Sequence, residues 1–199
     1  EKGMARTAES KYAIATRAIK DLTNYGIDNG DIFFDPLALP ISTGIEEDRN
    51  NASETLKSIK LIKENHKEVH IVLGVSNISF GLTPAARINL NSVYLNEAYK
   101  LGLDTAIVSP SKILPLSKIN NEHLKVCLDL IYDNREYENG ICNYDPLTKL
   151  TSIFEGVSTK AARGSKEIFD SLTTEEKLKQ HIIDGEKIDL NKSLDSGLK

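Results

Sequence analysis

Hydrophobic positions along the chain alternate between helical spacing and short apolar runs. Four stretches carry apolar residues three or four positions apart, as in helices with one buried face: 8–22, 51–65, 84–101 and 121–132. Three short apolar, β-branched runs are typical of buried strands: 31–35, 69–75 and 105–108. Because helices of about four turns separate these runs, the pattern predicts an α/β fold built from parallel βα units.

The second apolar run ends in a polar tip and is followed by a helix start. Residues 71–73, which we expect to be buried on both faces of a sheet, lead into Ser76 and Asn77. Thr83 before Pro84 predicts a helix whose first amides are capped by the threonine hydroxyl. In barrels of parallel strands, functional side chains lie at the carboxyl ends of the strands, which makes Asn77 a candidate. The alternative, that Asn77 only hydrogen-bonds its own loop, stays open.

The pattern changes after residue 132. Residues 133–140 are polar, and no later segment is predicted to be a buried strand. A short helix over 147–156 precedes a stretch of small and charged residues, 157–165, with the composition of a linker. Thr173 and Glu176 have the spacing of a capping box, which predicts a further helix, and a last helix is expected near Asp189. The C-terminal segment is therefore predicted to open an all-helical module.

Composition narrows the class of protein. The chain has 199 residues, of which 40% are hydrophobic and 27% charged, as in globular proteins of one domain or slightly more. Its net charge of -4 provides no basic field for nucleic acid or an anionic membrane, so we expect neither as a partner. No apolar run approaches the roughly 20 residues that span a bilayer. Cys127, on a predicted helix, and Cys142, in a predicted loop, suggest reduced thiols and a cytoplasmic location.

Three βα units raise a problem of closure. They cannot close a barrel by themselves, and an open sheet of three parallel strands would leave two unpaired edges and one uncovered face. We therefore expect the chain to be an incomplete piece of a larger protein and to be inactive by itself.

Three stretches carry motifs that are specific in combination: Asp31–Glu47 with Phe-Asp-Pro, Val72–Gly81 with Gly-Val-Ser-Asn, and Gly102–Val108. Together with residues 111–119, they resemble the last three strands of the folate-binding barrel in the family of cobalamin-dependent methionine synthases. Residues 175–186 are similar to the first helix of the helical cap over cobalamin in that family. Dihydropteroate synthases and corrinoid methyltransferases share the barrel but lack the linker and the cap-like tail.

The resemblance implies a fold and a division of the chain. Residues 1–140 would be the C-terminal part of a pterin-binding (β/α)8 TIM barrel like that of dihydropteroate synthase. Residues 141–165 would be a terminal helix and linker, and residues 166–199 the start of a helical cobalamin-binding cap.

The resemblance also implies site residues. The aspartate of the Phe-Asp-Pro motif, here Asp35, binds the pterin ring, because a carboxylate can accept hydrogen bonds that the amino and amide groups of the ring donate. The asparagine of the Gly-Val-Ser-Asn motif, here Asn77, lies beside the methyl-bearing pterin nitrogen, and Ser76 precedes it. Arg87 matches the second of two family arginines that follow this motif, whereas the first has no counterpart in the shorter Gly81–Thr83 segment.

The implied activity is methyl transfer from 5-methyltetrahydrofolate to cob(I)alamin, as part of methionine synthesis from homocysteine. The cobalamin would be bound mainly by another module of the same enzyme, and zinc would belong to the homocysteine module. We expect no metal ligands in this chain, because a break between helix and strand separates His66 from His70. One alternative is another pterin-barrel protein, either a corrinoid methyltransferase or a dihydropteroate-synthase-like protein. The other is a non-catalytic folate-binding scaffold.

Overall fold

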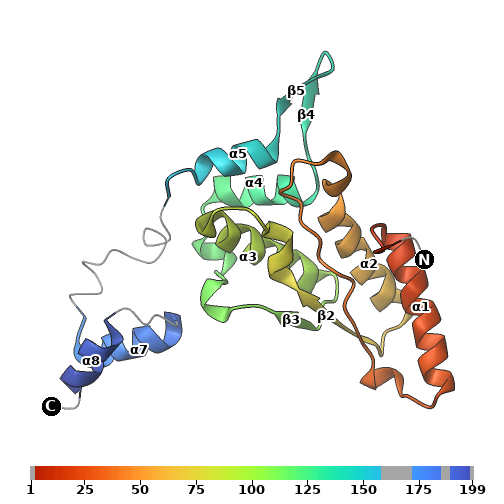
Figure 1. The fold of residues 1–199 in the computed structure, drawn as a ribbon, viewed down its shortest axis with the longest axis horizontal. Helices are drawn as coiled ribbons and strands as arrows, with labels where there is room; N and C mark the ends of the chain where they lie inside the picture. The colour runs from red at the N-terminus through yellow and green to blue at the C-terminus, as the bar shows by residue number, and fades with distance from the viewer. Residues whose placement is uncertain (1–2, 158–171, 185–188, 198–199) are drawn as a thin grey trace.

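A computed structural model describes residues 3–157, 172–184 and 189–197 (Figure 1). The long helices are α1 Ala8–Asn24, α2 Asn51–Asn65, α3 Pro84–Lys100 and α4 Asn121–Ile131. The strands are β1 Phe33–Phe34, β2 His70–Gly74, β3 Thr105–Ile107, β4 Glu136–Glu138 and β5 Ile141–Tyr144. The shorter helices are α5 Pro146–Ile153, α7 Thr174–Asp184 and α8 Leu190–Gly197. Single 3-10 turns are η1 Asn29–Asp31, η2 Glu46–Asp48, η3 Val75–Ser79, η4 Pro110–Lys112 and η5 Leu116–Lys118.

Strands β1, β2 and β3 form a parallel sheet in that order. Phe34 pairs with Ile71, and Leu73 pairs with Ala106. Each strand is followed by a helix, α1 packs beside α2, and α3 packs beside α4 (Figure 1). The prediction of parallel βα units is therefore confirmed.

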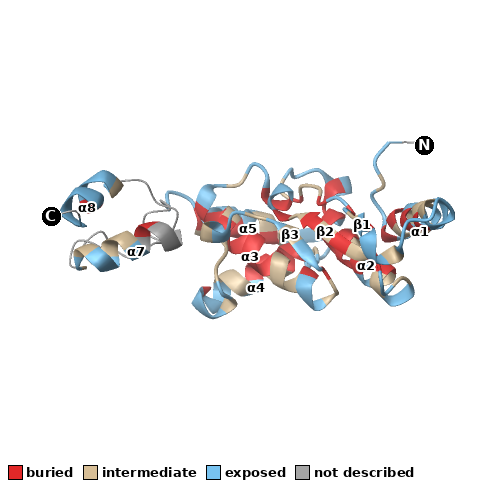
Figure 2. Ribbon diagram, turned by 90° about the horizontal axis from the view of Figure 1, so that it is seen from below, coloured by how far each residue is buried: buried red, intermediate tan, exposed pale blue. Residues whose placement is uncertain are grey.

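The two faces of this sheet have different surroundings. Ile71 and Leu73 are fully buried against the helices, and Figure 2 shows α2 and α4 to one side of the three strands. On the other face Val72 is only half-buried, while Phe33 is 54% and Ile107 64% exposed. The expectation that residues 71–73 are buried on both faces was wrong, because within the described residues only one face of β2 packs on helices.

Two helix ends show short-range backbone signals. Helix α1 stops before Gly26, whose φ of 90° continues the chain in the left-handed region that glycine adopts without strain. Pro84 occupies the first turn of α3 as predicted. The Thr83 side chain, however, makes no capping hydrogen bond, so the prediction of a threonine hydroxyl cap was wrong. Pro84, as the first residue of the helix, has no N–H that would need a partner, whereas the amides that a Thr83 cap would satisfy belong to the two residues after it.

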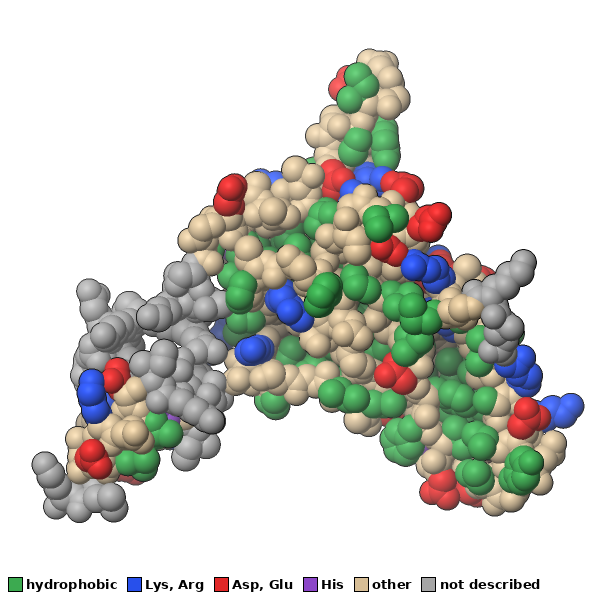
Figure 3. Space-filling view, viewed as in Figure 1, with side chains coloured by type: hydrophobic (Ala, Val, Ile, Leu, Met, Phe, Trp, Pro, Cys, Tyr) green, Lys and Arg blue, Asp and Glu red, His purple; other side chains and the backbone are tan. Residues whose placement is uncertain are grey.

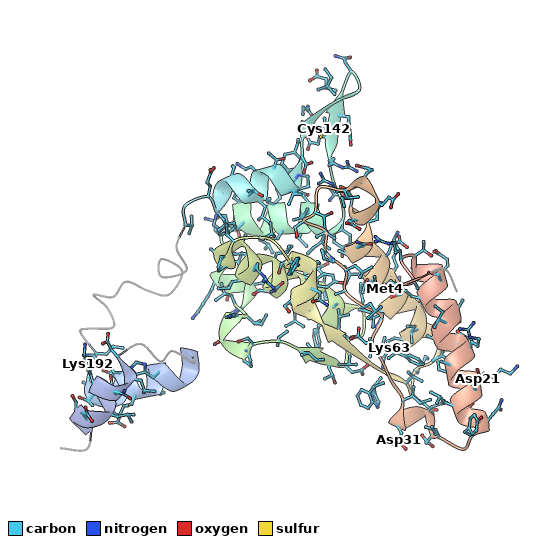
Figure 4. The ribbon with its side chains drawn as sticks, in the orientation of Figure 1. Met4, Asp21, Asp31, Lys63, Cys142 and Lys192 are labelled. Atoms are coloured by element: carbon cyan, nitrogen blue, oxygen red, sulfur yellow. The ribbon has the colours of Figure 1, made fainter. Side chains whose placement is uncertain are left out.

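A polar hairpin follows α4 that hydrophobic patterning did not detect. Strands β4 and β5 are antiparallel, and the side chains of β4 are exposed. Cys142, expected in a loop, lies on β5, in the arm that projects from the rest of the structure (Figure 4). Arg135 beside the hairpin donates two hydrogen bonds to Glu46, at 2.8 and 2.7 Å, which ties this region to η2.

The C-terminal helices agree with the predicted start signals. The Thr173 amide donates to Glu176 at 2.9 Å and the Glu176 amide donates to the Thr173 hydroxyl at 3.3 Å, so the capping box is confirmed. His181 is 4% exposed and lies 3.1 Å from the Ser193 hydroxyl on α8, which is a close contact between α7 and α8. The predicted linker lies outside the described residues except for Val157. Among the helices described, none has the length and apolarity of a membrane span.

Candidate active site

Asp35 and Asn77 lie at the same edge of the parallel sheet. Asp35 directly follows β1, and Asn77 lies in η3, which directly follows β2. Because β1 and β2 are parallel, their carboxyl ends face the same edge. Both side chains are exposed there and are open to a ligand at this sheet edge.

The carboxylate of Asp35 is partly committed to its own loop. Its Oδ1 accepts a hydrogen bond of 2.8 Å from the Leu37 amide, and Leu37 adopts a φ of 62°. A left-handed φ is uncommon for leucine, which indicates that the surrounding structure holds this turn in place. Within the described residues, Oδ2 of Asp35 has no hydrogen-bond partner, so it is available to a ligand.

Two side chains from outside the sheet hold the Asp35 loop. Lys11 of α1 donates to the Pro36 and Leu37 carbonyl oxygens, and Thr55 of α2 donates to the Leu37 oxygen at 3.0 Å. Lys11 is 6% exposed, and its burial lowers the pKa of its ammonium group to about 8, although Asp35 and Glu54 act in the opposite direction.

Lys11 is not among the predicted site residues, although its position in the sequence carries a signal. Lys11 lies three residues after Ala8 and four before Ala15, both of which are buried. It therefore occupies the predicted apolar face of its helix, where a lysine needs a specific partner.

The loop that carries Asn77 is anchored by its backbone and neighbouring side chains. The Ile41 amide donates to the Ile78 oxygen at 3.1 Å, and the Ser42 hydroxyl donates to the Phe80 oxygen at 2.6 Å. The Asn77 side chain makes no hydrogen bond to any residue that the structure describes. The alternative that Asn77 only stabilises its loop therefore finds no support in the geometry, because the backbone of this loop is held by other groups.

Arg87 and Ser76 meet on the other side of the same loop. The Arg87 guanidinium donates to the Ser79 hydroxyl and to the Ser76 carbonyl oxygen, both at 3.1 Å. The Ser79 hydroxyl also donates to the Ser76 oxygen at 3.1 Å. These bonds shape the turn on which Asn77 lies, so Arg87 has a positioning role in addition to any contact with a ligand.

An open cleft of about 530 Å³ lies between the carboxyl ends of β2 and β3. Its lining residues come from η3, α3 and the segment after β3: Ser76, Leu82, Pro84, Arg87, Ile88, Asn91, Val108, Ser109, Lys112 and Ile113. Asp35 and Asn77 do not line this cleft. The structure therefore separates the predicted site residues into an exposed pair, Asp35 and Asn77, and a second pair, Ser76 and Arg87, beside the cleft.

Comparison with known proteins shows the family of this chain. Residues 1–109 match the family described as pterin binding enzyme, and the chain belongs to that family. Over 200 aligned residues it is 46% identical to a methionine synthase of Mycobacterium tuberculosis and 44% identical to one of Mycobacterium leprae. Both alignments cover 100% of this chain but 16% of the relative's length. The resemblance read from the three motifs is thus confirmed.

Proposed function

We propose that this chain contributes the C-terminal part of a pterin-binding (β/α)8 barrel that binds 5-methyltetrahydrofolate for methyl transfer to cob(I)alamin in methionine synthesis. The observation that carries the proposal is the shared sheet edge of Asp35 and Asn77, each of which presents free hydrogen-bonding atoms. Whole-chain identity to methionine synthases supports it.

In this proposal the two residues have different tasks. Asp35 accepts hydrogen bonds from the amino and amide groups of the pterin ring, for which its Oδ2 is available. Asn77 lies beside the methyl-bearing nitrogen, where a neutral amide can donate or accept as that nitrogen gains a proton and loses the methyl group. The proton reaches the ring through water held by Asn77 and Asp35.

Arg87 and Ser76 support these two residues. The guanidinium of Arg87 fixes the Ser76 carbonyl and with it the turn of η3. Substrate contacts of Arg87 and Ser76 themselves are part of the proposal, since both line the adjacent cleft.

The division of the chain also remains a proposal: residues 1–140 as barrel, 141–165 as terminal helix and linker, and 166–199 as the start of a cobalamin-binding cap. The hairpin spans the first boundary, because β4 pairs with β5 across residues 140 and 141. We place the protein in the cytoplasm, which the two free cysteines support.

Cobalamin would be supplied by another module of the enzyme, and zinc by its homocysteine module. Among the described residues no group of three or more His, Cys, Asp or Glu is placed to hold a metal ion. When bound, cob(I)alamin supplies the nucleophile that accepts the methyl group.

The proposal is tested by titrating 5-methyltetrahydrofolate into the whole protein by calorimetry. Asp35→Asn keeps the acceptor for the Leu37 amide but removes the charge that binds the pterin, so affinity should fall about 10- to 100-fold. Asp31→Asn, an exposed aspartate before β1, is the matched control and should leave affinity unchanged. An unchanged affinity of Asp35→Asn would remove the assignment.

The same titration, combined with an assay of methyl transfer from 5-methyltetrahydrofolate in the whole enzyme, addresses the alternatives. A corrinoid methyltransferase would transfer the methyl group to a corrinoid without forming methionine, whereas a dihydropteroate-synthase-like protein would prefer pterins without the N5-methyl group. A scaffold would bind 5-methyltetrahydrofolate without transferring its methyl group.

A further inference from the structure

Helix α1 carries a buried lysine that contacts the chain just after β1. The side chain of Lys11 is 6% exposed, and no other lysine in the described part of the chain is buried. Figure 3 shows Lys and Arg side chains over α1 at the molecular surface, where basic side chains ordinarily lie. Burying an ammonium group is unfavourable unless hydrogen bonds replace those to water, so Lys11 is retained for its partners.

The hydrogen bonds of Lys11 converge on the two residues that directly follow Asp35. Its ammonium group donates to the Pro36 carbonyl oxygen and, at 3.2 Å, to the Leu37 carbonyl oxygen. The Leu37 oxygen also accepts from the Thr55 hydroxyl, whereas the Leu37 amide donates to Oδ1 of Asp35 at 2.8 Å. Leu37 is therefore held at both its carbonyl and its amide, and it connects the buried ammonium group to the candidate pterin carboxylate.

The backbone conformation of Leu37 depends on these contacts. Its φ of 62° lies in the left-handed region, which is unfavourable for a residue with a Cβ. Without donors to its carbonyl, the turn would relax towards a negative φ. Such a relaxation would move the Leu37 amide away from Oδ1 and leave the Asp35 carboxylate free to rotate.

Three charged groups face Lys11 from neighbouring segments. Asp35 after β1 and Glu54 of α2 raise the pKa of the Lys11 ammonium group, whereas Arg6 before α1 lowers it. Burial has the largest effect and lowers this pKa to about 8. Lys11 is therefore mostly protonated at neutral pH and loses its charge as the pH rises through about 8.

We propose that Lys11 is a positioning residue for the folate substrate, because its protonated side chain fixes the turn at Pro36 and Leu37 and so orients the Asp35 carboxylate towards the pterin ring. This inference rests on the proposed function. A neutral amine would donate weaker hydrogen bonds to the two carbonyls and would no longer attract Asp35. The affinity for folate therefore falls as Lys11 loses its proton.

The effect on affinity has the opposite sign to the effect on stability. Because burial disfavours the charged form, the contribution of Lys11 to the free energy of unfolding rises above about pH 8. A residue that only stabilised the fold would give no loss of affinity over this range. Affinity that falls while this contribution rises is the signature of a positioning role.

The first test is titration calorimetry of 5-methyltetrahydrofolate with the whole enzyme at several pH values. Between about pH 7 and pH 9 the wild-type affinity should fall by up to about tenfold, since only the protonated fraction is competent. Lys11→Met should bind about tenfold more weakly at pH 7 and show no such fall. Lys20→Met, an exposed lysine on the same helix, is the matched control and should follow the wild type. Titration of the ligand itself is common to all three proteins.

A double-mutant cycle then asks whether Lys11 acts through Asp35. In an Asp35→Asn background, Lys11→Met should weaken binding by less than about threefold, because the orientation of a carboxylate that is absent no longer matters. Lys11→Gln keeps an N–H donor without the charge and serves where Lys11→Met does not fold. It should show the same flat pH profile with a smaller loss of affinity at pH 7.

The outcomes separate this inference from the proposed function. If Asp35→Asn weakens folate binding but the Lys11 variants bind as tightly as the wild type, or follow its pH profile, only this inference fails. Equal losses on Lys11→Met in both backgrounds also overturn it, because the effect then does not pass through Asp35. If the wild type does not bind 5-methyltetrahydrofolate, or Asp35→Asn leaves its affinity unchanged, the proposed function fails and this inference with it.

Discussion

The Lys11 ammonium group lies 2.5 Å from the Pro36 carbonyl oxygen and donates a hydrogen bond to it. Lys11 belongs to α1, whereas Pro36 directly follows Asp35 at the end of β1. The first helix of the chain therefore holds the strand end on which the candidate pterin carboxylate lies. A buried charge of this kind is retained only where it has partners, which here are two backbone carbonyls.

Lys11 should give the stability of the fold a specific pH dependence. In the unfolded chain Lys11 holds its proton up to its ordinary pKa of 10.5, whereas burial lowers the pKa in the folded state to about 8. Between these values the unfolded state binds more protons, so the contribution of Lys11 to the free energy of unfolding rises with pH. Below about pH 8 both states are protonated and this contribution is constant.

Urea unfolding gives the free energy of unfolding of the wild type and of Lys11→Met from about pH 7 to pH 10. The contribution of Lys11 is the wild-type value minus the value of the variant. This difference should increase above about pH 8, because the contribution of Lys11 rises with pH. The effects of other titrating groups are common to both proteins and cancel. Lys20→Met, an exposed lysine on the same helix, should show no such trend. A difference that is independent of pH would contradict the lowered pKa.

Asn77→Ala should affect methyl transfer more than folate binding. Its side chain makes no hydrogen bond within the described structure, so its removal leaves the anchored loop intact. In the intact enzyme we expect single-turnover methyl transfer to slow by about tenfold or more, with a much smaller change in the dissociation constant of 5-methyltetrahydrofolate. Equal losses in rate and affinity would argue for a structural role. Asn121→Ala, at the exposed start of α4, serves as the control.

Gly102→Ala should destabilise the fold at the amino end of β3. Gly102 has a φ of 106°, and an added Cβ would lie 2.8 Å from Cγ of Lys63. Strain of this kind costs about 1–3 kcal/mol in the free energy of unfolding. Lys63 cannot move freely, because its ammonium group bonds both Asp104 oxygens at 3.1 Å.

Gly74→Ala is the matched control for that experiment. Gly74 has a φ of -76° and open space around the added Cβ, so the substitution should be close to neutral or slightly stabilising. Chemical unfolding of both variants gives the comparison, and equal destabilisation would show that the backbone conformation at Gly102 is not the cause.

The elements themselves were predictable because their signals are local. Helix α2 has the predicted bounds, and Pro84 and Thr173 with Glu176 marked helix starts through short-range backbone geometry. The hairpin β4–β5 was missed because its strands are exposed and show no hydrophobic alternation. Its turn did carry a signal: Asn139 and Gly140 both have positive φ, the conformation that Asn-Gly favours in a tight hairpin turn.

The sequence by itself determined the order of βα units and the polar strand ends at Asp35 and Asn77, because periodicity and strand termination depend on neighbouring residues. Only the tertiary structure decided that Lys11 holds the loop after Asp35 across 25 positions, and that Arg87, Asn91 and Lys112 line one cleft. Such contacts join residues from different elements. Their partners follow from how helices and strands pack, which no local pattern specifies.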